Sequence, residues 1–395
     1  MLARTFFTRV EGFCLNQSIA HISKTTAATQ LWDAVVIGGG PAGATSAFLL
    51  AHQGFKVLIV EKKTFPRAKV CGCCLSGRAV RQLEHLGLSD VLSRAIPLKS
   101  FVLKSAEKFV QLPTDGGVVL SRSELDYNLL QKAVAAGANL IQGSMAHLGQ
   151  MSDQSRIIKL QSPEETVSLE AKLVLCCCGL GEIPHDSDEE FPSVIKRNSK
   201  IGVAAVVDSG NWIESQTIEM IVDHSGYVGL VQLEDGKLNL AAALNRAMIK
   251  QAGGVTQVIC GMLERTGFDS RLKLIDPQWQ GTLPMTRQMR CPASPRTFLL
   301  GDAAGYVEPF TGEGMAWAFE SAELVQSLAG QAIHNWQPQL VQDWNFHYQK
   351  LVRKRQFTCK FLKRMLDTPW LIQPAIHLLN IAPQISRPFI RSIHG

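Results

Sequence analysis

A glycine-rich run near the N-terminus constrains the fold of this chain more than any other feature of the sequence. Residues 38–43 read Gly-Gly-Gly-Pro-Ala-Gly, and they join the short apolar segment 34–37 to an Ala- and Leu-rich segment at 41–52. A second apolar segment, 56–60, ends at Glu61. This order predicts a buried parallel strand, a helix and a second parallel strand, which is the beginning of an α/β fold.

Each glycine of the run has a physical task in binding a dinucleotide. Gly38 allows a tight turn from strand to helix, Gly40 leaves room for a pyrophosphate, and Gly43 lets the helix pack closely on the strand. The helix N-terminus offers free N–H groups to the phosphates, and the Glu61 carboxylate can accept hydrogen bonds from ribose hydroxyls. An acid at this position disfavours a 2′-phosphate, which leaves FAD or NAD. The predicted contacts are Gly38, Gly40, Pro41, Ala42, Gly43, Glu61 and Lys62.

A second signature lies far along the chain. Residues 301–305 read Gly-Asp-Ala-Ala-Gly after a predicted strand, and 309–314 read Pro-Phe-Thr-Gly-Glu-Gly before a predicted helix at 314–328. Together with the first run, this pattern resembles the flavoprotein superfamily of the aromatic-hydroxylase fold. The resemblance implies FAD as the cofactor, with Asp302 on a ribityl hydroxyl and a helix dipole facing the flavin O2. It adds the contacts Gly301, Asp302, Pro309, Gly312, Glu313, Gly314 and Met315.

Two shorter segments also bear on the cofactor site. Residues 122–126 match the superfamily's Arg-x-x-Leu-Asp helix start, which implies that Arg122 contacts the pyrophosphate or ribityl chain, and Ser123 is expected to cap this helix. The usual Ala-Asp-Gly element is replaced at 176–179 by Cys-Cys-Cys-Gly. Gly179 fits the pattern, but the acid that supports flavin reduction by a nicotinamide is missing. The electron donor is therefore open between NAD(P)H and a reduced partner protein, and the cysteines are predicted to be small packing residues.

Residues 65–72 narrow the resemblance to one branch of the superfamily. They read Phe-Pro-Arg-Ala-Lys-Val-Cys-Gly, which looks like the Pro-Arg-x-Lys-x-Cys-Gly segment of geranylgeranyl reductases, enzymes that reduce isoprenoid double bonds. Cys71 is then a candidate catalytic thiol, with Arg67 and Lys69 as cations that could favour its thiolate, and a buried inert thiol is the alternative. Tyr227 matches part of the branch's Gly-Tyr-x-Trp motif, so it either faces the flavin or belongs to the core.

The predicted elements describe an α/β chain with a Rossmann-type FAD-binding domain and an inserted antiparallel β-sheet. The inserted strands are expected at 201–207, 217–222, 227–233 and 238–243. The expected domains are an FAD-binding domain at 31–182 and 283–330, a substrate domain at 183–282, and basic C-terminal helices at 331–395, interrupted at prolines such as Pro374. Residues 1–30 are expected to be a flexible extension, although their Ser, Thr and basic residues also suit organelle targeting.

The charge of the chain is concentrated at the C-terminus. The net charge is +6, but residues 350–395 hold nine Lys or Arg and one acid, so the rest sums to −2. This distribution argues against nucleic-acid binding by the folded core. The basic segment 353–366 suits either a helix with a solvated basic face or peripheral contact with an anionic membrane. The ten cysteines do not form two well-separated CxxC pairs, the usual spacing of a zinc site, so we expect no metal site and a reducing, cytoplasmic setting.

The sequence thus predicts an FAD-dependent oxidoreductase that acts on an apolar or aromatic small molecule. Reduction of a C=C bond and flavin-based monooxygenation both agree with the motifs. A flavin halogenase is disfavoured because the Trp-x-Trp-x-Ile-Pro motif is absent from the sequence. An electron-transfer flavoprotein that serves a partner protein is the alternative from another class, because a basic tail could dock an acidic partner.

Overall fold

A computed structural model describes most of the chain between residues 21 and 382. The described residues are 21–351 and 369–382, without 115, 164, 182–184, 186–190, 198, 209–211, 269–276, 307 and 309–311. Predictions about residues 1–20, about Pro309 and about the basic segment 353–366 therefore lie outside the described residues.

The first layer is a parallel sheet with the topology of a dinucleotide-binding domain. Its main path runs β19-β20-β11-β1-β2-β8, and β1 pairs in parallel with both β2 and β11. The strands of this path are β1 (Leu31–Ile37), β2 (Val57–Glu61), β8 (Asn139–Gln142), β11 (Thr166–Cys176), β19 (Ala293–Ser294) and β20 (Thr297–Leu299). In addition, β10 (Arg156–Gln161) pairs with β11, and β9 (Met145–Met151) pairs with β10.

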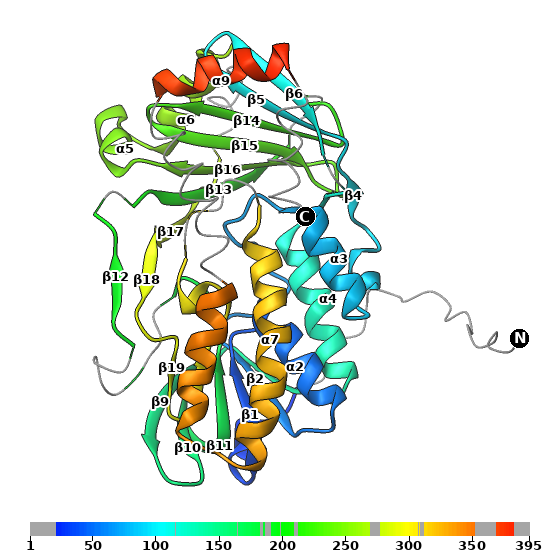
Figure 1. Ribbon diagram of the computed structural model, residues 1–395, viewed down its shortest axis with the longest axis vertical. Helices are drawn as coiled ribbons and strands as arrows, with labels where there is room; N and C mark the ends of the chain where they lie inside the picture. The colour runs from blue at the N-terminus through cyan, green and yellow to red at the C-terminus, as the bar shows by residue number, and fades with distance from the viewer. Residues whose placement is uncertain are drawn as a thin grey trace, which may run out of the picture.

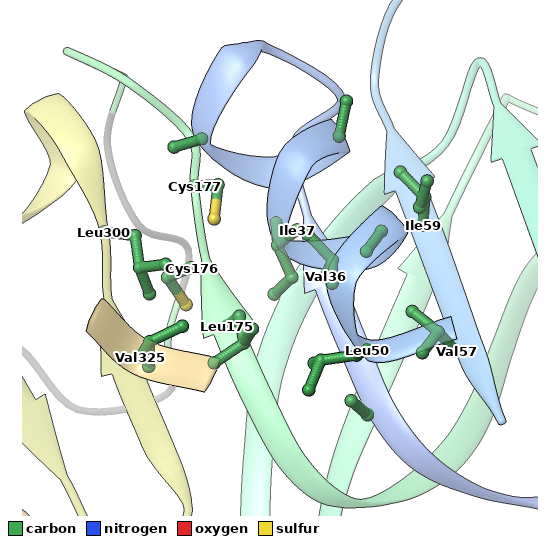
Figure 2. Packing of buried hydrophobic residues seen from close by; sticks show 14 of the residues in the cluster. Val36, Ile37, Leu50, Val57, Ile59, Leu175, Cys176, Cys177, Leu300 and Val325 are labelled. Atoms are coloured by element: carbon green, nitrogen blue, oxygen red, sulfur yellow. The ribbon is translucent and has the colours of Figure 1, made fainter. Parts of the chain in front are cut away.

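Three helices cover one face of this sheet. They are α2 (Pro41–His52), α4 (Arg122–Ala135) and α7 (Gly314–His334), which lie side by side in Figure 1. The strands are apolar on both sides because helices and loops cover them, as a buried parallel sheet requires. Val36, Leu50 and Leu175 are each no more than 1% exposed and pack together between α2 and the strands (Figure 2).

The second layer is a seven-stranded sheet with the order β17-β13-β16-β15-β14-β5-β6. The four strands expected from the sequence are confirmed as β13 (Ile201–Val207), β14 (Thr217–Asp223), β15 (Gly226–Gln232) and β16 (Leu238–Leu244). The added strands are β5 (Ser100–Ser105), β6 (Lys108–Pro113) and β17 (Gln280–Pro284). β5 and β6 belong to the segment assigned to the FAD-binding domain, but β5 pairs in parallel with β14, so this hairpin extends the inserted sheet.

Smaller elements connect and cover the two sheets. These are α1 (Lys24–Ala28), α3 (Gly77–His85), α5 (Arg246–Ala252), α6 (Val255–Glu264), α9 (Pro369–Ile381), β3 (Cys74–Leu75), β4 (Ile96–Pro97), β7 (Val118–Val119), β12 (Ser193–Ile195) and β18 (Arg287–Met289). Figure 1 places α9 on the outside of the second sheet, over β5 and β6.

Three local expectations are corrected by the structure. Ser121, not Ser123, caps α4, because its hydroxyl accepts the Glu124 amide at 3.2 Å. Helix α9 continues through Pro374, where a break was expected. Within the segment expected to be flexible, residues 24–28 form helix α1, whose Ala27 carbonyl accepts the Trp32 indole N–H at 2.9 Å. In this last case a tertiary contact overrides a weak local pattern.

Candidate cofactor and substrate site

The glycine run forms the expected turn, and its geometry leaves no room for side chains. Gly38 has a φ of +104°, and a Cβ atom added to it would lie 2.5 Å from the Cys177 carbonyl oxygen. A Cβ atom added to Gly43 would overlap the Gly38 carbonyl oxygen. Gly40 is the N-cap residue of α2 and lines the large cavity of the protein. These positions meet the steric requirements of a dinucleotide-binding turn.

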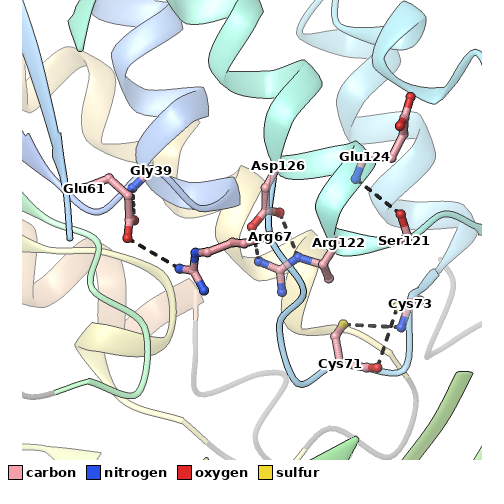
Figure 3. Close-up of polar contacts among 9 residues, drawn as sticks. All are labelled: Gly39, Glu61, Arg67, Cys71, Cys73, Ser121, Arg122, Glu124 and Asp126. Atoms are coloured by element: carbon pink, nitrogen blue, oxygen red, sulfur yellow. Dashed lines mark hydrogen bonds and ion pairs between the residues drawn. The ribbon is translucent and has the colours of Figure 1, made fainter. Parts of the chain in front are cut away.

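Glu61 is held at the end of β2 by backbone donors. Its Oε2 accepts the Gly39 amide at 2.9 Å, and its Oε1 accepts the Lys63 amide at 3.0 Å. A guanidinium nitrogen of Arg67 lies 3.5 Å from Oε1 (Figure 3). A carboxylate has about four lone-pair positions, so acceptor capacity remains for ribose hydroxyls. The acid predicted to bind ribose is therefore fixed beside the glycine turn.

A partly buried lysine lies beside the glycine turn that would hold the phosphates of a dinucleotide. The Nζ atom of Lys69 is 3.4 Å from the Cβ position of Gly40 and 3.8 Å from that of Gly179. Burial lowers the pKa of Lys69, as does the charge of Arg122, while Asp302 acts in the opposite direction. Two cations beside a helix N-terminus form a strong anion-binding environment. Sequence reasoning considered Lys69 only as a neighbour of Cys71 and missed this position.

The environment of the Cys71 thiol comes from Cys73 and Arg122 rather than from the two cations nearest in sequence, Arg67 and Lys69. The Cys73 amide donates to the Cys71 sulfur at 3.4 Å (Figure 3), and Arg122 interacts with the same sulfur. The hydrogen bond with the Cys73 side chain has the largest effect, and together with the positive charge of Arg122 and the Cys73 amide it lowers the pKa of Cys71 to about 5 despite burial. Arg122 is itself fixed by Asp126 through two hydrogen bonds of 2.8 and 2.7 Å. The thiolate is thus the favoured form at neutral pH.

The second signature meets the first at the carboxyl end of the parallel sheet. A Cβ atom added to Gly301 would lie 3.1 Å from the Cβ of Ala42, which shows how closely the two segments approach. Burial raises the pKa of Asp302 to about 6, and the charges of Lys69 and Arg122 limit the rise. At the start of α7, these residues line the same cavity: Gly312, Gly314 and Met315. Glu313 is buried at the N-cap of α7.

Both signatures open into one cavity of about 1420 Å³. This volume exceeds the roughly 300–1,000 Å³ of a site for one drug-sized ligand, so a dinucleotide and a second molecule can be accommodated. Lys62, Cys71, Gly179 and Tyr227 also line this cavity. The structure therefore brings the described candidate residues of the sequence together in a single space, apart from Gly43 and Glu313, which lie next to it.

The far end of the cavity is formed by the second sheet, and its chemistry is different. Among the described lining residues contributed by β5, β6 and β13 to β17, none is charged. Aliphatic side chains predominate there, including Leu112, Ile218, Met220 and Val231. Asn239 on β16 ties this end to the cofactor end, because its amide donates to the Cys71 carbonyl at 3.1 Å.

The three consecutive cysteines pack behind the glycine turn. Cys176 and Cys177 are no more than 7% exposed, and the Cys177 Cβ lies 3.1 Å from the Cβ position of Gly43. A larger side chain at Cys177 would push α2 off the strand. Gly179 follows with a φ of +66° and lines the cavity. These contacts support the expectation that Cys176 and Cys177 are small packing residues.

A comparison with protein families accounts for this geometry. The FAD binding domain family model matches residues 32–334, which is most of the chain. The chain belongs to this FAD-binding family. It is an FAD-dependent oxidoreductase of the superfamily that includes geranylgeranyl reductases, halogenases and monooxygenases.

Several members of the FAD-binding family resemble the chain over nearly its whole length. A menaquinone reductase of Mycobacterium tuberculosis is 24% identical over 374 residues, covering 89% of this chain and 90% of the relative. A digeranylgeranylglycerophospholipid reductase of Thermoplasma acidophilum is 23% identical and covers 89% of each chain. Among solved structures, a geranylgeranyl bacteriochlorophyll reductase-like protein of that organism has a TM-score of 0.73 at 20% identity, covering 88% of this chain and 91% of its own. A flavin-dependent brominase has a TM-score of 0.75 at 14% identity, covering 92% and 94%.

The residues present fit FAD, the cofactor of the family. The glycine turn would hold the pyrophosphate, with Lys69 as an additional charge, and Glu61 would hold the adenosine ribose. Asp302 and the start of α7 would face the ribityl chain and the pyrimidine edge of the flavin. The individual contacts remain predictions.

Among the described residues, no helix is both long and apolar enough to cross a bilayer.

Proposed function

We propose that the protein reduces a C=C bond of an apolar, isoprenoid-like molecule, with bound FAD as the source of hydride. The observation that carries the proposal is the uncharged, largely aliphatic end of the cavity under the second sheet. Such a wall stabilises a hydrocarbon chain by removing it from water and offers little to a charged substrate. The similarity to reductases of isoprenoid-bearing lipids and quinones supports the same substrate class.

The protein's residues would orient the substrate and supply a proton. When bound and in its reduced form, FAD would supply a hydride for one alkene carbon and would itself be oxidised, and the other carbon needs a proton. Tyr227 is buried at 9% exposure and lines the cavity, and a phenol keeps its proton at neutral pH. Cys71, whose pKa is about 5, is a thiolate at neutral pH and a poor proton donor there. We therefore assign proton donation to Tyr227, and to Cys71 a role in the electrostatics of the reacting end.

Anaerobic reoxidation of the reduced holoenzyme tests this function. We would reduce the flavin chemically, mix it with a detergent-dispersed polyprenyl alkene, and follow the flavin absorbance together with the saturation of the product by mass spectrometry. The proposal predicts oxygen-independent reoxidation with one double bond reduced per flavin. Hydroxylated product that forms only with oxygen would identify a monooxygenase instead. Reoxidation by a protein acceptor alone would identify an electron-transfer flavoprotein.

Tyr227→Phe separates the proton donor from the binding of the substrate. The variant keeps the ring that packs in the wall but loses the hydroxyl, so single-turnover reduction of the alkene should slow by about 10²- to 10⁴-fold. FAD binding should be unchanged. An unchanged rate would remove Tyr227 from the chemistry while leaving the reductase assignment intact.

A further inference from the structure

Helix α9 is the outermost element over one end of the second sheet, and one of its faces is fixed there (Figure 1). Ile372 and Ile376 are at most 2% exposed and share an apolar cluster with Leu112, which also lines the cavity. The Asn380 amide donates to the carbonyl oxygen of Phe109 on β6 at 2.7 Å. The inner face of α9 is thus separated from the aliphatic end of the cavity by little more than the β6 strand.

The opposite face of α9 is also apolar. Leu371, Pro374, Leu378 and Ile381 recur at spacings of three and four residues, which places them along one side of the helix. Leu378 is 51% exposed and Ile381 is 69% exposed. The helix contains no Asp, Glu, Lys or Arg. A helix that is apolar on two opposite faces is normally covered on both, so this outer face requires a partner.

The neighbouring strand enlarges the apolar surface. Phe109 on β6 is 58% exposed and is joined to α9 by the Asn380 hydrogen bond. We call the outer face of α9 together with Phe109 the α9 surface. Glu107 and Lys108, next to Phe109, are both exposed, so this edge of the surface carries no net charge.

The charge of the flanking sequence indicates the chemistry of the partner. Residues 350–395 carry nine Lys or Arg and one acid around the uncharged α9. An apolar helix surface inside a strongly basic stretch suits an anionic lipid surface, because the bilayer accepts apolar side chains and its headgroups attract the cations. A second copy of the chain would bring two such basic stretches together, which like-charge repulsion opposes.

We propose that the α9 surface rests on an anionic lipid bilayer. The inference builds on the proposed function, since the cavity end behind β6 would then lie close to the membrane in which an isoprenoid-like substrate resides. Leu378, Ile381 and Phe109 enter the apolar boundary of the bilayer, and the basic flanking sequence binds the headgroups.

Co-sedimentation of the full-length holoenzyme with vesicles tests the inference. One vesicle preparation contains equal parts of phosphatidylglycerol and phosphatidylcholine, and the other contains phosphatidylcholine alone. We expect binding to the mixed vesicles, weakening with added salt, and little binding to the neutral ones. The double variant L378E/I381E should bind at least about tenfold more weakly, because two carboxylates replace the side chains that enter the bilayer. The matched control is M151E/V194E, which adds the same two carboxylates at exposed apolar side chains, each 49% accessible, on β9 and β12, away from α9 (Figure 1).

The outcomes separate the membrane from other partners and from the reductase function. Phe109→Ser changes the α9 surface without altering the helix itself, so its vesicle binding tests the inference even if the double variant is unstable. Equal binding by wild type and both surface variants would overturn the inference. The inference would also be overturned if light scattering found wild type to be a dimer and either surface variant to be a monomer, because a second copy of the chain would then cover the α9 surface. Vesicle binding needs no turnover, whereas reoxidation by a detergent-dispersed alkene needs no membrane, so each proposal fails by its own measurement.

Discussion

Arg122 and Asp126 lie one helical turn apart on α4, and the Arg122 guanidinium donates two hydrogen bonds to the Asp126 carboxylate. The same guanidinium interacts with the sulfur of Cys71. The bidentate pair removes the rotational freedom of the guanidinium, so its charge is held beside the thiol. Because Asp126 fixes Arg122, and Arg122 favours the thiolate, the protonation of Cys71 depends on an ion pair in a different segment of the chain.

Replacing Arg122 should raise the pKa of Cys71. In the variant Arg122→Gln the thiolate loses its cationic neighbour, so the pH midpoint of Cys71 alkylation by iodoacetamide should move upward from about 5. The unpaired Asp126 should also destabilise the fold by about 3–5 kcal/mol. Cys71→Ser identifies the labelled peptide by mass spectrometry. An unchanged midpoint would show that Cys73, and not Arg122, controls the pKa of the Cys71 thiol.

The pKa of Asp302 predicts a stability difference that depends on pH. Its carboxyl has a folded-state pKa of about 6, above its ordinary value of 3.8. The contribution of the Asp302 carboxyl to the free energy of unfolding is therefore fully present below pH 3.8 and is lost as the pH rises through 6. FAD-free Asp302→Asn should be more stable than wild type at pH 7 by about 1–2 kcal/mol, and the difference should vanish near pH 4. Urea unfolding at the two pH values measures it.

The same substitution, Asp302→Asn, should weaken the binding of FAD. If Asp302 accepts a ribityl hydroxyl, Asp302→Asn should lower FAD affinity by about tenfold, the effect of one hydrogen bond to a charged group. Quenching of FAD fluorescence on titration with the FAD-free protein gives the dissociation constant. If Asp302→Asn is more stable than wild type but binds FAD more weakly, the buried carboxylate destabilises the FAD-free fold and serves cofactor binding. Unchanged FAD affinity would show that Asp302 takes no part in binding FAD.

Lys69→Met should weaken FAD binding more strongly and make it less sensitive to salt. The substitution removes a partly buried cation beside Gly40, which we expect to cost about 10- to 100-fold in affinity, equivalent to one charge-assisted hydrogen bond. Lys63→Met is the control, because Lys63 is an exposed lysine near Glu61 whose backbone, not its ammonium, contacts that residue. Equal loss in both variants would mean that Lys69 acts only through overall charge.

Gly43→Ala should lower both the stability of the fold and the amount of FAD that the protein binds. The added methyl group would overlap the Gly38 carbonyl oxygen, so α2 must move away from β1, at a cost of about 1–3 kcal/mol. The variant should purify with little flavin. Gly330→Ala in α7 is the matched control: its Cβ would meet Phe55 at an ordinary 3.8 Å, so alanine should be neutral or stabilising and the protein should remain yellow. Full flavin content in Gly43→Ala would contradict the steric argument.

The sequence by itself determined the features that depend on neighbouring residues. The turn at Gly38, the acid at the end of β2 and the four inserted strands from 201 to 244 follow from steric requirements and side-chain alternation within short segments. The resemblance to flavoproteins then indicated FAD, and the family match bears this out.

Only the tertiary structure decided which distant groups meet. Lys69 reaches Gly40 and Gly179, and Arg122 reaches Cys71, because separate loops converge at the carboxyl end of the parallel sheet. Nothing in the hairpin 100–113 predicts that it pairs with β14, since register between distant strands depends on packing rather than on local pattern. The same holds for α9, whose two apolar faces can be read from its sequence, whereas the fold alone determines that one is buried on the sheet and the other is left exposed.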